Sequence, residues 1–384
     1  MLVDNPMLSD KRIEKEIETL KKNFNCSIKV IAMKEKNLPE LEIKSGYEIL
    51  RLIGTKIKRT LKRGYKKYLK TISKTISEFS FDILHCHDYH MLFIGSEVKK
   101  LKPNVKLIYD SHEYLKGWPL YLTNHGIANK LKGYLVWKKD LIHEKKSIRY
   151  TDKIITVTNS IANSLKEDFN LKHTPTVLSN FPELIKFENN DYLKNKFNIG
   201  KEKKLIIHSG SIYYSDKQVN QLFDIINDFD KVVLIFIGNR QRFYNLKNKT
   251  KNKAKNNIIN KVFFEDYPKE YDSLFSLLCS ADVGLLHVRN KWKAHKMGSA
   301  NKFIEYSHAG LAVISTFQNT AIEINKRFNH CNFYDENNFN EFKTALNQTL
   351  KNLDSLKNNA LKTREEINWD SESKKLVELY NTLL

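Results

Sequence analysis

Short apolar runs alternate with stretches of helical spacing along the first half of the chain. The runs that predict strands lie at residues 28–32, 82–87, 106–110, 153–157 and 176–178. Between them, apolar side chains recur at helical intervals in residues 10–22, 91–100, 127–149 and 160–168. Strands that alternate with helices predict an α/β architecture built on a parallel sheet.

A second set of strands and helices follows Pro182 and the polar run at residues 188–191, which together indicate a linker. Its predicted strands are residues 204–210, 232–238, 262–264, 283–286, 312–315 and 332–334. Two consecutive sets predict two doubly wound, Rossmann-like domains that face a cleft. We expect domains at 1–182 and 183–365 and a final helix over 366–384. Only residues 1–3 are available as an opening strand, so that strand is either very short or incomplete.

The chain is strongly basic, with a formal net charge of +21 over 384 residues and a pI of about 9.5. Such a charge predicts an acidic partner, unless part of the excess only reflects a sequence rich in lysine and asparagine. Four separated cysteines without a C-x-x-C pair indicate reduced thiols. With no secretory leader and no apolar run approaching ~20 residues, we expect a cytoplasmic protein, in solution or peripheral on the inner face of the plasma membrane.

The densest charge lies between residues 51 and 76, which contain no acidic residue. The basic side chains are Arg51, Lys56, Lys58, Arg59, Lys62, Arg63, Lys66, Lys67, Lys70 and Lys74. Apolar side chains recur among them at helical spacing, so the segment predicts a basic amphipathic helix on an anionic membrane surface. The alternative is an outer helix whose apolar stripe packs on its own domain. Nucleic acid is not expected, because no nucleic-acid motif accompanies the charge.

Residues 301–315 combine a short helix, a glycine and a buried strand. Gly310 suits the left-handed position that ends a helix, and residues 311–314 read as a parallel strand. Glu305 therefore lies in a helix near the mouth of an α/β sheet, where ligands bind.

This segment resembles the donor-binding motif of glycosyltransferase family four, which has the GT-B fold. Residues 82–88 with 107–113 resemble the acceptor-domain signature of that family, residues 155–161 its last strand and following helix, and residues 368–370 its C-terminal hallmark. The resemblance implies a hexosyl- or N-acetylhexosaminyl-type transferase with a UDP or GDP sugar donor, acting with retention and without a cofactor or obligatory metal. It also implies a glycan or lipid-linked acceptor in bacterial surface polysaccharide or glycolipid synthesis, and a last helix that crosses back to the first domain.

The resemblance assigns donor contacts to the second domain. It implies that Glu305 holds the ribose and that the loop of Gly210 and Ser211 holds the diphosphate with Lys217, helped by Lys302. Asn301 belongs to the same side. Two departures stand out: Ser211 falls where the family has an arginine, and Met297 falls where it has its first glutamate. His295, Lys296, Ser299 or Asn301 are the candidates to replace that glutamate.

Histidine and carboxylate side chains mark the acceptor side. The resemblance places His112 and Asp88 as catalytic groups, with His87 and Glu113 beside them. A histidine at a strand end can donate a hydrogen bond to a developing oxyanion or position an incoming hydroxyl, although it can also simply cap the strand.

Two other functions stay open at this point. His85, His87, Asp88 and His90 are dense enough to suggest a metal-dependent hydrolase. The missing glutamate and arginine instead favour a catalytically decayed binding protein that uses the basic segment on a membrane or nucleic acid.

Overall fold

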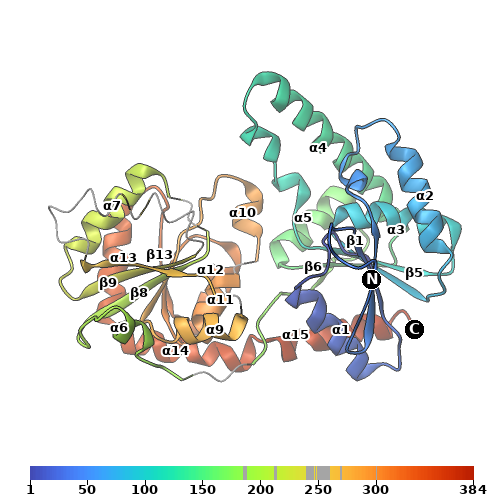
Figure 1. Cartoon of the computed structure of the whole chain (residues 1–384). Coiled ribbons are helices and arrows are strands. Elements are labelled where there is room, and N and C mark those ends of the chain that lie inside the picture. Colours follow the sequence, from blue (N-terminus) through green and yellow to red (C-terminus); the bar gives the residue numbers. More distant parts are fainter. Residues whose placement is uncertain are drawn as a thin grey trace. The chain divides into compact units, whose positions relative to one another are not determined.

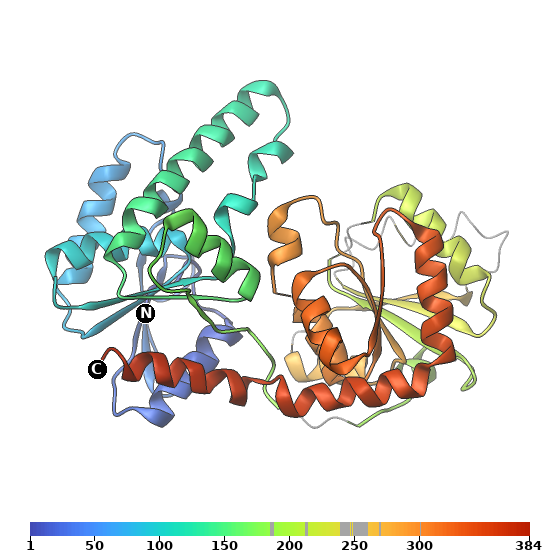
Figure 2. The ribbon, with the colours of Figure 1, turned by 180° about the vertical axis from the view of Figure 1, so that it is seen from behind.

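The computed structural model describes residues 1–184, 188–211, 214–238, 246, 248, 260–268, 270–299 and 301–384. Its contacts divide the chain into two compact units, drawn in Figure 1 and, from behind, in Figure 2. Unit 1 consists of Met1–Asn180, Trp292–Gly298 and Glu372–Leu384, and unit 2 of Phe181–Lys291 and Ser299–Ser371.

Unit 1 contains two sheets that share the first residues of the chain. The three-stranded sheet has the order β1 (Lys29–Met33), β3 (Tyr47–Ile53), β2 (Leu41–Lys44). The other has the order β4 (Ile83–His87), β5 (Lys106–Ser111), β6 (Lys153–Thr156), β7 (Thr176–Val177), with all pairs parallel. Leu2 pairs in parallel with both Ile31 and Cys86 and so connects β1 to β4. The predicted short opening strand is therefore a single bridging residue.

Helices cover both faces of these strands. They are α1 (Lys11–Asn23), α2 (Tyr65–Ser77), α3 (Tyr89–Leu101), α4 (Ile127–Ser147), α5 (Asn159–Phe169) and α15 (Trp369–Asn381). The short helix α10 (Lys293–Met297) belongs to the same unit and contacts the 3₁₀ turn Leu115–Gly117. The Asp10 side chain caps α1 by accepting a hydrogen bond from the Ile13 N–H. From Glu372 onward α15 belongs to unit 1, where the Tyr380 hydroxyl lies 3.0 Å from His85 Nδ1.

The predicted amphipathic helix over residues 51–76 is wrong in its extent. Residues 51–53 end strand β3, a 3₁₀ turn covers Thr55–Lys58, and the helix α2 begins only at Tyr65. Arg51 is buried, and its guanidinium donates 2.6 Å to Glu42 Oε2 and 2.9 Å to the Pro6 carbonyl. The helical spacing gave a wrong boundary because β3 and α2 both bury apolar side chains. A strand followed by a turn can place apolar residues at the same intervals as a helix.

Most of the apolar stripe of this segment is not available to a membrane. Except for Leu61, which is exposed, its side chains lie in or against the core of unit 1 together with Leu84 and Phe93. The buried members are Ile53, Ile57, Tyr65, Leu69, Ile72 and Ile76. The basic side chains of α2 stay exposed on the opposite side, so the segment has the structure that the alternative interpretation described.

Unit 2 is built on one parallel sheet of six strands. Their order is β10 (Val262–Asp266), β9 (Val232–Gly238), β8 (Lys204–Ser209), β11 (Val283–Leu286), β12 (Ala312–Thr316), β13 (Cys331–Tyr334). Its helices are α6 (Tyr192–Lys196), α7 (Asp216–Asn227), α9 (Tyr271–Leu278), α11 (Asn301–His308), α12 (Asn319–Phe328), α13 (Phe339–Lys351) and α14 (Leu353–Glu366). Successive residues of β8 face two different apolar clusters, Leu205 and Ile207 one, Ile206 the other.

The strand order of unit 2 reverses at β8. The chain moves outward from β8 to β9 and β10, then returns to β8's other side with β11 and continues to β12 and β13. In open α/β sheets ligands bind at the carboxyl ends of the strands where the order reverses. The prediction of two doubly wound α/β units is confirmed, and the end of β8 is where a ligand site is expected in unit 2. Within the described part of the chain, no helix combines the length and apolar character needed to cross a membrane.

Candidate functional site

The loop after β8 places a cation against the backbone of a glycine. Gly210 has φ = +87°, a conformation that side chains with a Cβ rarely adopt. A methyl group added there would overlap the Lys302 ammonium, so Lys302, in the first turn of α11, lies directly over this glycine. The positive φ is what requires glycine in this turn, and the flexible end of Lys302 lies against it.

Glu305 lies one turn further along α11 and is largely withdrawn from solvent. The Tyr271 hydroxyl donates a hydrogen bond to Glu305 Oε1 at 3.4 Å. Burial raises the pKa of Glu305, opposed by the Lys302 ammonium and the tyrosine hydrogen bond. Burial lowers the pKa of Lys302, opposed by Glu305. A carboxylate and an ammonium are therefore held close together at the switch point of the sheet.

Tyr306 fixes α11 to the end of β8. Its hydroxyl accepts a hydrogen bond from the Ser209 N–H at 2.8 Å, and its ring covers Gly284, where a Cβ would overlap it. Because Tyr306 is fully buried, the neighbouring Glu305 has little freedom to move away from β8.

The other predicted donor residues lie around this pair with different exposure. Ser211 is half-buried. Asn301 is exposed, and its side-chain carbonyl accepts a hydrogen bond from Ser299 Oγ at 2.6 Å. Lys217 is exposed in the first turn of α7, whose cap residue Ser215 forms a capping box with Gln218. The positive end of α7 and the Lys217 ammonium both favour an anion.

Met297 is a core residue of unit 1. Its side chain packs with Tyr114, Val157, Ile161 and Leu165, and its carbonyl accepts from Thr158 Oγ1 at 2.7 Å. A glutamate here would bury a charge in an apolar cluster. Among the proposed substitutes, His295 stacks on Trp292, with ring centroids 5.2 Å apart, whereas Lys296 is exposed.

Asp110 is the centre of a buried charge network in unit 1. Arg12 Nη2 donates to both of its oxygens, at 2.9 and 2.7 Å, and Arg12 Nε donates to Glu16 Oε1 at 3.1 Å. Burial alone would raise the pKa of Asp110, but the cations Arg12 and His112 hold it well below its usual range. Asp110 is therefore a carboxylate at neutral pH.

His112 lies between two carboxylates. Its Nε2 is 3.1 Å from Asp110 Oδ2, and its Nδ1 is 3.3 Å from Asp88 Oδ2. Burial and Arg12 lower the pKa of His112, but Asp88 and Asp110 outweigh them and raise it to about 10. Since a carboxylate can only accept, both ring nitrogens donate, and His112 is an imidazolium.

The remaining predicted acceptor-side residues surround His112. His87 Nδ1 lies 3.3 Å from His112 Nε2, on the strand next to it. Asp88 also accepts from the backbone N–H of His112, at 3.3 Å. Glu113 is exposed directly after this group. The structure thus brings His112, Asp88 and His87 together at the carboxyl ends of β4 and β5, with Glu113 beside them.

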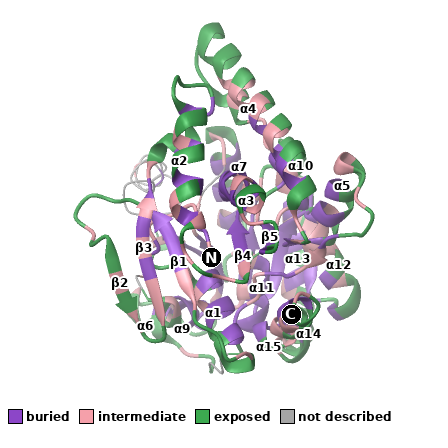
Figure 3. Ribbon diagram, turned by 90° about the vertical axis from the view of Figure 1, so that its right-hand side faces the viewer, coloured by how far each residue is buried: buried purple, intermediate pink, exposed green. Residues whose placement is uncertain are grey.

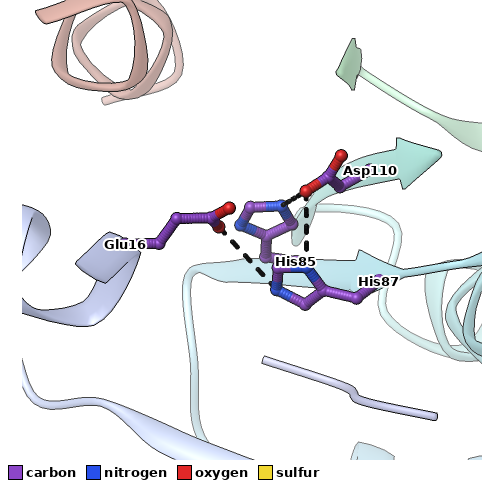
Figure 4. A group of neighbouring side chains, drawn as sticks. All are labelled: Glu16, His85, His87 and Asp110. Atoms are coloured by element: carbon purple, nitrogen blue, oxygen red, sulfur yellow. Dashed lines mark ion pairs between the residues drawn. The ribbon is translucent and has the colours of Figure 1, made fainter. Parts of the chain in front are cut away.

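The suspected histidine cluster separates into different environments. His90 Nδ1 lies 3.1 Å from Asp4 Oδ2, whereas the rings of His85 and His87 stack 4.3 Å apart over α1. Glu16, His85, His87 and Asp110 offer atoms that all lie within 4.8 Å of one another, and Figure 4 shows them converging. However, the Arg12 guanidinium already bonds both carboxylates of this group, so it supplies the positive charge that a metal would bring.

Arg12, Glu16 and Asp110 were missed as site residues. Arg12 and Asp110 are 98 positions apart in the chain, and nothing in the helical pattern of residues 10–22 links them. The only available signal is that Arg12 and Glu16 are four residues apart, beside the apolar positions Ile13 and Ile17.

Comparisons with known proteins agree with this architecture. Residues 22–181 match the model of Glycosyltransferase Family 4, and residues 189–366 match that of Glycosyl transferases group 1. With the two doubly wound units, these matches define a GT-B glycosyltransferase. Within this class the chain belongs to the family-four group, as its sequence motifs predicted.

Solved structures of this class cover the whole chain at low sequence identity. Sucrose-phosphate synthase from Thermosynechococcus elongatus superposes with a TM-score of 0.73 at 14% identity, covering 100% of this chain and 98% of its own. The Anabaena protein HepE in complex with UDP gives a TM-score of 0.70 at 11% identity, covering 99% of this chain and 98% of its own. A trehalose-6-phosphate protein from E. coli bound with UDP-2-fluoro glucose gives a TM-score of 0.69 at 12% identity, covering 100% of this chain and 98% of its own. No curated protein sequence matches the chain significantly.

Proposed function

We propose that this glycosyltransferase moves a hexosyl or N-acetylhexosaminyl group from a UDP or GDP sugar to a glycan or lipid-linked acceptor, with retention of configuration. The UDP and UDP-2-fluoro glucose named with the similar HepE and E. coli structures favour a uridine donor. Bacterial surface polysaccharide or glycolipid synthesis is the setting that the family resemblance supports.

The observation that carries the proposal is the position of Lys302 over Gly210, with Glu305 one turn away. An ammonium beside a bare glycine backbone suits a diphosphate, which carries its charge on oxygens that approach the chain closely. A withdrawn carboxylate suits the two hydroxyls of a ribose, because it accepts hydrogen bonds from both. We therefore assign the donor to residues 183–365, with Lys217, Ser211 and Asn301 at its edges.

In the reaction, the bond between the anomeric carbon and the diphosphate oxygen breaks, and the acceptor oxygen bonds to that carbon. The proton of the acceptor hydroxyl passes to the departing diphosphate oxygen, on which negative charge develops as its bond breaks. Lys302 and Lys217 would stabilise that charge, since a fixed cation stabilises charge that develops in the transition state.

We assign the acceptor to residues 1–182, completed by the helix at 366–384. His112 is an imidazolium whose two N–H groups bond Asp110 and Asp88, so it would hold these carboxylates in place and stabilise nearby negative charge, and it cannot itself take a proton. Asp88 is the neighbouring group with free acceptor capacity: burial raises its pKa, but His112 outweighs this and lowers it, so it stays ionised. Asp88 would orient the incoming hydroxyl, with His87 and Glu113 beside it.

Turnover of nucleotide sugars tests the proposal. The full chain is incubated with UDP-glucose, UDP-N-acetylglucosamine and GDP-mannose, with and without a mixture of sugar and lipid-linked acceptors, and release of nucleoside diphosphate is measured. We expect release from one donor class, stimulated by acceptor, and an α-linked product by NMR from an α-linked donor.

Two substitutions separate the assigned roles. Glu305→Gln should raise the KM for the donor, because the amide accepts more weakly than the carboxylate. His112→Gln should lower kcat by at least tenfold with a smaller effect on KM. A β-linked product would overturn retention, and an absence of release from every donor in the parent chain would support the decayed binding protein instead.

A further inference from the structure

The helix α4 carries its polar and apolar side chains on the wrong sides for a helix that packs on a protein core. Its buried residues are Asp140, Glu144 and Ser147. Its large apolar residues are exposed instead: Ile127 by 88%, Leu131 by 59%, Leu135 by 49% and Ile142 by 54%. These four fall within an arc of roughly 80° around the helix, opposite the buried polar residues. This stripe is unpartnered within the described part of the chain.

The 3₁₀ turn at Leu120–Thr123 packs on another side of α4 and exposes further apolar side chains of its own. It packs on α4 at Gly133, where a Cβ would overlap Tyr121 and Asn124. The rings of Tyr121, Tyr134 and Trp137, each partly exposed, lie 5.4 to 6.0 Å apart where the turn meets α4. In the turn itself, Leu120 and Leu122 are 49% and 45% exposed. We call residues 120–147 the finger; within unit 1, α4 extends well beyond the strands (Figure 1), and its far end is exposed (Figure 3).

The charges exposed on α4 are of one sign. Its two carboxylates are buried, and the Tyr109 hydroxyl donates to Glu144 at 2.7 Å. Its exposed charged side chains are Lys130, Lys132, Lys138, Lys145 and Lys146. Lys138 and Lys145 continue the apolar stripe toward the body of unit 1. In the same unit, residues 56–74 expose further basic side chains without a carboxylate among them.

We propose that the finger docks unit 1 on an anionic lipid surface. Isoleucine and leucine at the tip would enter the boundary between headgroups and acyl chains, while the lysines contact lipid phosphates and the Tyr and Trp rings lie at headgroup level. A second copy of this chain would bring like charges together, and nucleic acid would leave the apolar tip exposed to water. The proposal does not depend on the assignment of donor or acceptor. It transfers the predicted membrane contact from residues 51–76 to residues 120–147.

Co-sedimentation with vesicles tests the finger. The full chain is mixed with vesicles of phosphatidylcholine alone or with added phosphatidylserine, and its partition coefficient is measured at low and high salt. We expect strong binding only to the anionic vesicles, weakened by salt. The triple variant Ile127→Gln, Leu131→Gln, Leu135→Gln should bind more than tenfold more weakly. Reversal at Lys130→Glu, Lys138→Glu and Lys145→Glu should weaken binding by more than a hundredfold, because three attractions are lost and three repulsions are added.

Matched substitutions at exposed sites outside the finger control for lost hydrophobicity and charge. They are Ile43→Gln, Leu101→Gln and Leu384→Gln for the first variant, and Lys22→Glu, Lys351→Glu and Lys374→Glu for the second. Both controls should bind as the parent does, and all variants should keep its thermal midpoint. Failure of the parent to bind anionic vesicles, or equal binding by finger and control variants, overturns the proposal. A parent dimer that the finger variants convert to monomer overturns it in favour of contact between copies.

Discussion

At the residue scale, His112 illustrates how neighbouring charges determine what a side chain can do. Two carboxylates face its two ring nitrogens, and its pKa rises to about 10. The sequence indicated a cleft histidine without distinguishing a base from a donor, because that distinction depends on Asp88 and Asp110 together. The structure makes His112 a donor.

The pH dependence of stability should report this charge. A histidine with a raised pKa contributes stability that is complete below its unfolded pKa of 6.5 and is lost as pH rises through about 10. The difference in unfolding free energy between the parent and His112→Gln should therefore shrink across this window, by about 1.4 kcal/mol per pH unit. Urea denaturation of both proteins at several pH values measures it. A difference that stays constant with pH would show that His112 is neutral.

Lys302 should discriminate diphosphates from nucleosides. Loss of a charge-assisted contact costs about 1.5–3 kcal/mol, so Lys302→Met should weaken binding of the nucleoside diphosphate by at least tenfold. Binding of the nucleoside alone should change little. Calorimetric titration of both ligands measures this, with the exposed Lys326→Met of α12 as the control for lost charge. Equal weakening of both ligands would mean that Lys302 supports the fold rather than the phosphates.

At the element scale, α2 shows where a sequence pattern becomes ambiguous. An apolar stripe with basic flanks suits both a membrane and the protein's own core, and only the positions of β4 and α3 decide between them. The same limit applied to the finger. In the sequence, the apolar stripe of α4 looks like one that faces a core, and only the structure shows that the buried residues are Asp140, Glu144 and Ser147. The strands of both sheets were predictable because they are short, apolar and separated by helices.

Truncation of the α2 stripe tests its burial. Leu69→Ala should lower the free energy of unfolding by about 2–5 kcal/mol, because it removes buried methyl groups and leaves a cavity. The neighbouring Lys70→Ala, on the exposed side, should change it by less than about 0.5 kcal/mol. Denaturant melts compare the two. Similar small effects for both would place the stripe outside the core.

A buried ion pair between Arg12 and Asp110 joins α1 to β5. Arg12→Met leaves Asp110 and Glu16 without their main cation and should cost about 3–5 kcal/mol of stability. Adding Asp110→Asn to Arg12→Met should restore part of this loss, since no carboxylate is then left uncompensated at that position. A double-mutant cycle by urea denaturation gives the coupling. Additive effects would show that the pair contributes no interaction of its own.

At the scale of the whole molecule, the order of motifs along the chain predicted the class better than any single motif did. Glu305 with Gly210, and His112 with Asp88, each mark the carboxyl ends of a different set of strands, and the fold places each pair at such an edge. The contacts that crossed long stretches of chain, such as Arg12 with Asp110, had no local pattern to reveal them. Met297 was recognised as a departure, but its burial among Tyr114 and Ile161 was not.

Calorimetric titration with UDP and GDP, on the parent and on Glu305→Gln, tests the central claim most directly. A ligand at a hundred times its Kd stabilises the protein by about 2.7 kcal/mol, so a thermal shift of several degrees with the same ligand gives an independent check. We predict binding of one nucleoside diphosphate by the parent and at least tenfold weaker binding by Glu305→Gln. Binding of neither, or equal affinity in the two proteins, would contradict a donor site at Gly210, Lys302 and Glu305.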